Sequence, residues 1–218
     1  MIPYLKRALR RLIAKGPRDT LAYSFHVARN HALSGYIDLR YGRKVSTTRP
    51  LKHLGLPDPT AIHHSTYYVL SEIFRLEPVS PADVLVDVGC GDGRVINYWL
   101  YCGLRNRIVG IEIDPATAHS TAKRLARYSN VEIICGDASG VDLDGTVFYL
   151  FNPFGGRMLA DFERRRRGRP GKIIIYNYNH LTPFIGDHWQ LRYHTSTRDD
   201  RQYRVVVLLP QSSPGATS

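Results

Sequence analysis

Cysteine, long apolar runs and acidic residues near the N-terminus are all scarce in this chain of 218 residues. The three cysteines, Cys90, Cys102 and Cys135, are too few and too scattered for a disulfide framework, and none belongs to a CxxC pair of the kind that binds zinc. No apolar run approaches the roughly 20 residues that a membrane-spanning helix needs, so we do not expect an integral membrane protein. The expected setting is reduced and cytoplasmic, with no metal site.

The charge is distributed unevenly along the chain. Residues 1–52 contain 12 Lys or Arg against only Asp19 and Asp38, a balance of +10, whereas residues 53–218 are nearly neutral at +1. This basic segment favours an anionic partner, either nucleic acid or a membrane surface, although a helix docked on the domain and a mitochondrial transit peptide are alternatives. Its first part has the apolar spacing of an amphipathic helix, carried by Leu5, Leu9, Leu12 and Ile13.

Loop-forming residues separate this basic segment from the rest of the chain. Residues 35–60 are rich in Gly, Pro, Ser and Thr, which predicts a linker, and residues 61–76 predict a helix capped by Thr60. The chain therefore divides into a basic N-terminal extension with a linker or lid (1–60), a main domain (61–210) and a flexible tail (211–218).

From residue 83 onward, short apolar runs alternate with segments of helical length, which predicts βαβ units and a mostly parallel sheet. The last two strands are close together and suggest an antiparallel hairpin. We expect an α/β, Rossmann-like, doubly wound sheet of seven strands with a helical N-terminal extension. The predicted strands are 84–88, 108–113, 131–135, 147–151, 172–176, 189–193 and 203–208, and the predicted helices are 93–103, 115–128 and 156–167.

The strongest motif is a glycine-rich turn between the first of these strands and the helix that follows it. Gly89, Gly91 and Gly93 let the backbone bend tightly and approach a ligand closely, and the next helix presents its N-terminal N–H groups. A dinucleotide fingerprint would need glycine at position 94, where this chain has Arg94. The spacing therefore argues against NAD.

The stretch from Asp87 to Gly93 resembles the first motif, D/E-x-G-x-G-x-G, of class I S-adenosylmethionine-dependent methyltransferases. The resemblance implies S-adenosylmethionine as the cofactor, bound in a crevice at one edge of the sheet. The ends of the next three strands continue it in the family's order, with Glu112 in Val109–Asp114, Asp137 in Ile134–Ala138 and Asn152 in Tyr149–Phe154.

A narrower resemblance, to a group of small, mostly bacterial methyltransferases of unassigned substrate, covers roughly residues 36–210. It rests on Tyr36–Gly42, His64–Tyr68, Leu150–Phe154 and Ile175–Asn177. In that group Tyr67 and the stretch 38–42 would lie over the cofactor as a lid; ordinary loop packing is the alternative. The cofactor-binding residues implied by both resemblances are Asp87, Gly89, Cys90, Gly91, Gly93, Glu112, Ile113, Asp137, Ala138, Asn152 and Tyr67.

Individual carboxylates have different expected roles. Asp87 resembles the acid that binds the methionine end of the cofactor, and capping of the glycine turn is its alternative role. Glu112 is expected to accept hydrogen bonds from the ribose, because a carboxylate at the end of an apolar strand needs a partner. Asp137 fits the adenine, with turn formation as the alternative. Asp114 precedes Pro115 and is expected to cap a helix.

The fourth strand end bears on the reaction. Asn152, Pro153 and Phe154 resemble the Asn/Asp-Pro-Pro-Tyr/Phe motif of enzymes that methylate amino nitrogen, but the second proline is missing, which puts amine specificity in doubt. We expect these three residues to be catalytic, in methyl transfer to a nitrogen or oxygen of a small-molecule or lipid-linked acceptor. The alternatives are an RNA methyltransferase, a protein side-chain methyltransferase and a non-catalytic cofactor-binding regulator.

Two other features favour ordinary structural roles. The cationic run Arg164–Arg167 with Arg169 is expected to be the solvated end of a helix rather than a nucleic-acid site. His63 and His64 show no metal-ligand spacing, and we expect packing or surface roles for them, with an acid/base role in a substrate pocket as the alternative.

Overall fold

The computed structural model describes residues 2–41, 64–141, 144–151, 156–178, 181–196 and 203–211. Its helices are α1 (Ile2–Arg40), α2 (Tyr67–Leu76), α3 (Arg94–Tyr101), α4 (Pro115–Leu125) and α5 (Gly156–Arg166), with a short 3-10 helix at Thr182–Phe184. Its strands are β1 (Leu85–Val88), β2 (Ile108–Glu112), β3 (Val131–Cys135), β4 (Val147–Phe151), β5 (Lys172–Tyr176), β6 (Trp189–Ser196) and β7 (Tyr203–Pro210).

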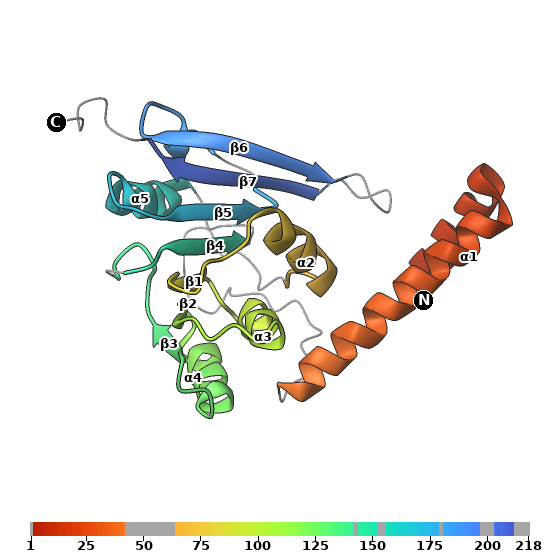
Figure 1. Cartoon of the computed structure of the whole chain (residues 1–218), viewed down its shortest axis with the longest axis horizontal. Coiled ribbons are helices and arrows are strands. Elements are labelled where there is room, and N and C mark those ends of the chain that lie inside the picture. Colours follow the sequence, from red (N-terminus) through yellow and green to blue (C-terminus); the bar gives the residue numbers. More distant parts are fainter. Residues whose placement is uncertain are drawn as a thin grey trace.

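The described strands form one seven-stranded sheet in the order β3-β2-β1-β4-β5-β7-β6 (Figure 1). Strands β1 to β5 pair in parallel, whereas β7 is antiparallel to both β5 and β6. The predicted α/β sheet with a final antiparallel hairpin is confirmed. The hairpin is inserted so that β7, the last strand in the sequence, lies between β5 and β6.

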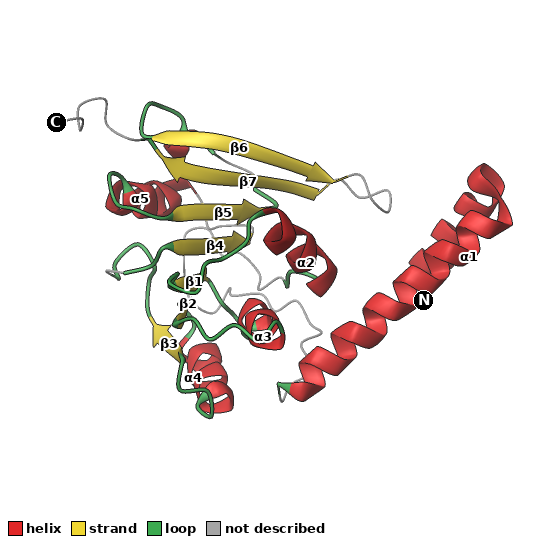
Figure 2. Ribbon diagram, viewed as in Figure 1, coloured by secondary structure: helices red, strands yellow, loops and turns green. Residues whose placement is uncertain are grey.

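Helices cover both faces of the sheet, which is why its central strands β1 and β4 are buried along almost their whole length (Figure 2). One core lies under α1, α2, α3 and α4 and includes the fully buried Trp99 and Leu70. The other lies under α5 and the 3-10 helix and includes Phe162 and Phe184. The sheet edge where β1, β2 and β4 end is left for the loops that follow these strands.

The prediction that a linker begins at residue 35 was wrong, because α1 continues to Arg40. Its last turns are helical because they pack on the domain: Ile37 is fully buried and Tyr41 nearly so. Near its other end, α1 is kinked at Gly16, whose φ of 84° and ψ of 176° are not helical. The rest of the predicted linker lies outside the described residues.

The predicted helix at 61–76 begins later than expected. α2 starts at Tyr67, and its N-cap is Thr66, whose hydroxyl accepts a hydrogen bond from the N–H of Val69 at 3.3 Å. The predicted cap, Thr60, lies outside the described residues. Two threonines six positions apart have the same capping chemistry, so the sequence pattern could not choose between them.

The arginine run at the end of α5 is only partly solvated, contrary to the prediction. Arg164 and Arg165 are exposed, but Arg166 is buried, donates to the carbonyl of Pro170 and lies over the ring of Phe148 at 4.2 Å. Arg167 pairs with the buried Glu163 at 2.8 Å. Arg166 therefore packs on β4 through Phe148, whereas the pair made by Arg167 stays within the end of α5.

Asp38 fastens α1 to the domain. Its two carboxylate oxygens accept hydrogen bonds from the hydroxyl of Tyr67 at 2.6 Å and from the guanidinium of Arg94 at 2.7 Å. Arg94 also lies 5.0 Å from the centre of the Tyr67 ring. Burial and the neighbouring Asp38 raise the pKa of Tyr67, so this phenol keeps its proton and remains a donor. One buried carboxylate thus joins α1, α2 and α3.

We expect Asp38→Ala to lower the free energy of unfolding by about 3–5 kcal/mol, because it removes the buried carboxylate that pairs with the largely buried Arg94. Urea denaturation measures the change. The control is Asp161→Ala, which breaks the more exposed pair with Arg164 and should change stability by less than about 1 kcal/mol. Equal, small changes in the two variants would contradict the anchoring role of Asp38.

Candidate functional site

The glycine turn between β1 and α3 is built from backbone that other residues adopt only with strain. Gly89, Gly91 and Gly93 have φ angles of 76°, 51° and 71°. The N–H groups of Gly89 and Cys90 both donate to the carbonyl of Ile111, at 2.9 and 2.8 Å. The turn therefore folds over the end of β2.

Glu112, the last residue of β2, holds this turn through its side chain. It is 3% exposed, and its carboxylate accepts hydrogen bonds from the N–H of Gly91 at 2.8 Å and of Asp114 at 2.9 Å. Burial raises the pKa of Glu112, and hydrogen bonds from the backbone of Asp114, Gly91 and Ile113 offset part of that rise. A carboxylate has about four lone-pair sites, so Glu112 can still accept a hydrogen bond from a ligand hydroxyl.

Asp87 lies in β1, beside this turn, and has a different environment. It is 3% exposed, and its Oδ2 has no hydrogen-bond partner in the described part of the chain. Burial, together with the negative charge of Glu112, raises the pKa of Asp87 well above its usual value. A buried polar atom without a partner is costly, so Asp87 fits a site whose ligand supplies that partner.

Other predicted residues at this edge of the sheet differ in their burial and in their hydrogen bonds. Ala138 is buried, but Asp137 is exposed, and its carboxylate accepts from the N–H of Ser139 at 2.8 Å. That contact is the turn predicted as its alternative role, and it leaves the second oxygen available. Cys90 is buried, and burial raises the pKa of its thiol well above the usual value, as expected for a small filler. Ile113 follows β2 and is half-buried.

Tyr67 is a core residue in this structure: it is almost fully buried and its hydroxyl is bonded to Asp38. Its place beside Arg94, the residue after Gly93, brings it near the glycine turn without exposing it as a lid. Asn152, Pro153 and Phe154 lie outside the described residues; β4 ends directly before them, at Phe151. The prediction that Asp114 caps a helix is confirmed, because its carboxylate accepts from the N–H of Thr117 at 3.1 Å.

The sequence motifs did not predict the residues that support the turn from neighbouring elements. Arg124 in α4 donates to the carbonyl of Tyr41 at 2.8 Å and to the side chain of Asn97 at 3.1 Å, so it ties the end of α1 to α3. His64 lies 3.7 Å from the buried Asp92 of the turn. In the sequence, Asp38 stands out among these residues because it is one of only two acids in the basic segment 1–52.

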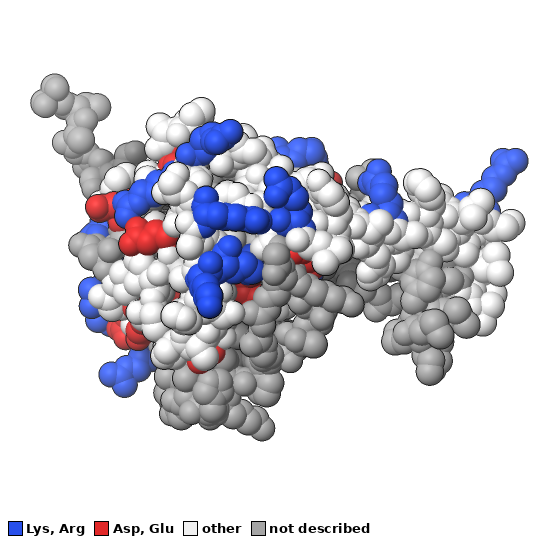
Figure 3. All heavy atoms as spheres, turned by 90° about the horizontal axis from the view of Figure 1, so that it is seen from below, with Lys and Arg blue, Asp and Glu red and all other residues white. Residues whose placement is uncertain are grey.

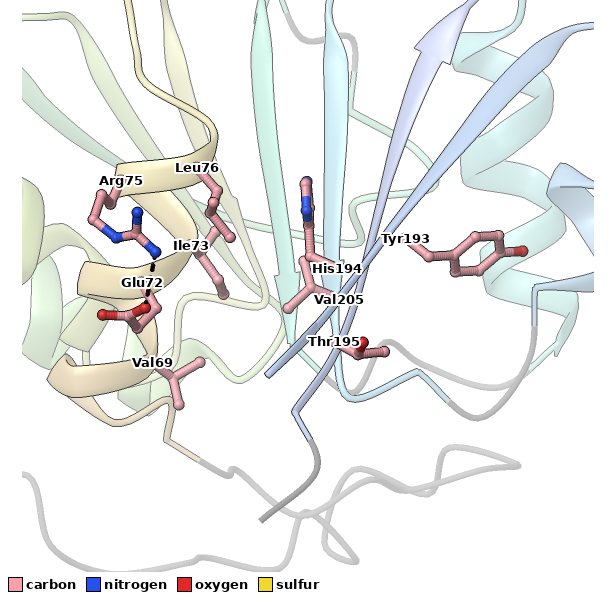
Figure 4. Close-up of a pocket in the computed structure, with 9 residues that line it drawn as sticks. All are labelled: Val69, Glu72, Ile73, Arg75, Leu76, Tyr193, His194, Thr195 and Val205. Carbon is pink, nitrogen blue, oxygen red and sulfur yellow. Dashed lines mark hydrogen bonds and ion pairs between the residues drawn. The ribbon is translucent and has the colours of Figure 1, made fainter. Parts of the chain in front are cut away.

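A separate cavity of about 420 Å³ lies between α2 and the β6–β7 hairpin (Figure 4). It is lined by apolar side chains such as Ile73 and Val205 and by the Glu72–Arg75 ion pair. His194 reaches it from β6 while hydrogen-bonded to Glu77 at 2.9 Å. None of the predicted site residues lines it, so the glycine turn and this cavity are distinct features.

The chemistry of the turn fits a nucleoside-containing cofactor with hydroxyl and charged groups. Acceptor oxygens of Glu112, an unsatisfied oxygen of Asp87 and glycine backbone meet at the edge where parallel strands end, which is where open α/β sheets bind ligands. No cluster of His, Cys, Asp and Glu suited to a metal ion occurs among the described residues.

Comparison with protein families decides the cofactor. Residues 85–163, from β1 to most of α5, match the family model described as a methyltransferase domain. This segment is therefore similar to a methyltransferase domain, and the match supports a class I S-adenosylmethionine-dependent methyltransferase. Its cofactor is S-adenosylmethionine, and Glu112, Asp87 and the glycine turn belong to the matched segment of this domain.

Relatives of this methyltransferase domain carry varied names. A probable ribosomal RNA small subunit methyltransferase A from Methanosarcina acetivorans is 24% identical over 150 residues, which are 67% of this chain and 54% of the relative. The chain thus spans about half the length of that curated protein.

Solved structures share the fold of this domain. An RNA methyltransferase from Salinibacter ruber in complex with S-adenosyl-L-homocysteine is 23% identical with a TM-score of 0.51, over 72% of this chain and 99% of that one. TrmN from Thermus thermophilus is 15% identical with a TM-score of 0.56, over 67% of this chain and 49% of that one.

We expect Glu112→Gln to weaken S-adenosylmethionine binding at least about tenfold, because the amide offers one acceptor where the carboxylate offers two. It should also lower the melting temperature, since the N–H of Gly91 or of Asp114 loses its acceptor. Titration calorimetry and thermal unfolding measure the two effects. Glu132→Gln, the same change at an exposed position of β3, is the control and should alter neither. Unchanged affinity in Glu112→Gln would remove this residue from the binding site.

The raised pKa of Asp87 predicts that the stability of the fold depends on pH. Because its pKa is higher in the folded than in the unfolded protein, the ligand-free fold loses stability as the pH rises above about 4, where the unfolded chain releases this proton first. Asp87→Asn removes that loss, so its stability relative to the native protein should improve as the pH rises from about 5 to about 8. Urea denaturation at both pH values tests this; parallel pH profiles would contradict it.

Proposed function

We propose that this protein transfers the methyl group of S-adenosylmethionine to a nitrogen or oxygen of a small-molecule or lipid-linked acceptor. The observation that carries the acceptor class is the charge around the turn. Asp87, Asp92, Glu112 and Asp137 surround it, and residues 53–218 as a whole have a balance of only +1. A protein binds a polyanion such as RNA through many Lys and Arg side chains, which displace the counterions of the phosphates.

The cations closest to the turn are already engaged. Arg94 pairs with Asp38, and Arg124 donates to backbone carbonyls and to Asn97. Neither guanidinium is free to bind a phosphate without breaking a contact that holds α1 in place. This supports an acceptor of low charge beside the cofactor.

The cofactor, when bound, supplies a methyl group activated by a positively charged sulfur. The glycine turn allows its close approach, Glu112 accepts hydrogen bonds from hydroxyl groups, and Asp87 gains the partner that it lacks in this structure. Asn152, after β4, is placed in sequence to accept a hydrogen bond from the acceptor. Alignment of the two reactants alone can contribute roughly 7–11 kcal/mol, so a strong base is not required.

RNA methyl transfer is the second candidate, favoured by the similarity to the RNA methyltransferases of Methanosarcina acetivorans and Salinibacter ruber. It requires that residues 1–52, rather than the domain, supply most of the phosphate contacts, because most of the net charge is there. RNA binding should then weaken steeply between about 50 and about 200 mM salt.

Labelled S-adenosylmethionine distinguishes these candidates. The protein is incubated with a bacterial lysate, and label is counted in the lipid and small-molecule fractions and in purified RNA. We expect label in the former, and we expect Asn152→Ala to reduce it at least about tenfold with little change in cofactor affinity. Gln190→Ala, at an exposed position of β6, is the control. Label that is removed by ribonuclease would overturn the proposed acceptor class and favour RNA.

A further inference from the structure

One side of α1 is apolar and exposed. Leu21, Phe25 and Leu39 are 74%, 71% and 74% exposed. They belong to a stripe whose members recur every three or four residues, the spacing that places side chains on one helix face. The members of this outer stripe are Leu21, Phe25, Ala28, Ala32, Tyr36 and Leu39.

Apart from Tyr36, whose ring centre lies 6.4 Å from that of Tyr101 in α3, the outer stripe is not the side by which α1 docks on the domain. Docking uses the opposite side, where Ile37 and Tyr41 are buried and His26 contacts the ring of Tyr68 at 5.1 Å. Much of α1 extends beyond the rest of the molecule (Figure 1). Exposed apolar surface of this extent and regularity indicates an interaction site.

A row of arginines runs along one flank of the outer stripe. Arg18, Arg29 and Arg40 are exposed and eleven residues apart, which is close to three helical turns, so they lie above one another along the helix. In Figure 3 the projecting part of α1 shows mostly uncharged surface with separate basic side chains.

No acid balances this arginine row on the outer side of α1. Residues 1–52 contain two acids. Asp38 is buried against Arg94, and Asp19 precedes Ile37 by eighteen residues, five helical turns, which places it on the docked side. The outer side therefore combines apolar and positive groups.

We propose that α1 binds the surface of an anionic lipid bilayer, with the outer stripe in the headgroup and acyl boundary and the arginine row on lipid phosphates. Interfacial helices are recognised by this combination of a Leu/Phe face and flanking Arg or Lys. Each cation near an anionic surface and each buried apolar side chain adds to the binding. No helix within the described residues is long and apolar enough to cross a membrane, so the contact is with the surface.

Two other candidate partners, RNA and a second copy of this chain, would each use only one of the two features of this surface. RNA would use the arginines, but leucine and phenylalanine gain nothing from phosphates. A second copy of this chain would cover the leucines, but its own α1 has no exposed acid to pair with the arginine row. A bilayer that contains anionic lipid takes both.

Vesicle co-sedimentation of the full chain tests the proposal. The probes are vesicles of phosphatidylcholine alone and vesicles with about one-third phosphatidylglycerol. We expect at least about tenfold stronger binding to the anionic vesicles, and at least about tenfold weaker binding for Leu21→Ser/Phe25→Ser and for Arg18→Gln/Arg29→Gln. Ile185→Ser is the matched control, since Ile185 is 72% exposed on the domain itself and should leave binding unchanged.

Unfolding temperature and cofactor affinity should be unchanged in all of these variants, because the substituted side chains are exposed and distant from the glycine turn. No sedimentation with anionic vesicles would overturn the proposal, as would equal loss in the Ile185→Ser control. Salt-sensitive RNA binding that depends on the arginines but not on Leu21 and Phe25, without vesicle binding, would assign the surface to RNA instead. A dimer in ultracentrifugation that Leu21→Ser/Phe25→Ser abolishes, without vesicle binding, would assign it to a second copy.

Discussion

The structure of the site depends on one buried carboxylate. Glu112 is shut away from water at the end of β2, and it is tolerable there because the N–H groups of Gly91 and Asp114 satisfy it. The same two hydrogen bonds set the course of the glycine turn and the start of α4. In the proposed function, the residue that holds the backbone of the site also offers its remaining lone pairs to the cofactor. Binding and architecture cannot be separated at this position, which is why the conservative change to glutamine is more informative than removal of the side chain.

The N-terminal helix is coupled to that turn by short contacts. Arg94, which pairs with Asp38 of α1, directly follows Gly93, and Arg124 joins the carbonyl of Tyr41 to α3. The end of α1 is thus part of the support of the cofactor site rather than an appendage. The charged groups that make these contacts are buried and paired. The side chains that face the turn are therefore mainly acidic. The positive charge of the chain remains on the outer side of α1.

Strand positions could be predicted to within a few residues because parallel strands covered on both faces are continuous apolar runs between turn residues. Glu112 was found for the same reason: a carboxylate in such a run needs a partner. The end of α1 was missed because Ser34 and Gly35 favour a loop locally, whereas burial of Ile37 and the ion pair of Asp38 come from residues distant in sequence. Arg166 was misjudged likewise, since the ring of Phe148 beneath it cannot be inferred from a run of cations.

Helix α1 connects the proposed lipid surface to the proposed reaction site. The docked side touches the residues that support the glycine turn, and the outer stripe lies on the other side of the same helix, whose width with side chains is about 10–12 Å. A bilayer held by the outer stripe would therefore lie about one helix diameter from the contacts made by Asp38. A basic helix on a nearly neutral domain is thus consistent with the proposed acceptor class, because the positive charge serves attachment, whereas the acidic surroundings of the turn disfavour a polyanionic acceptor.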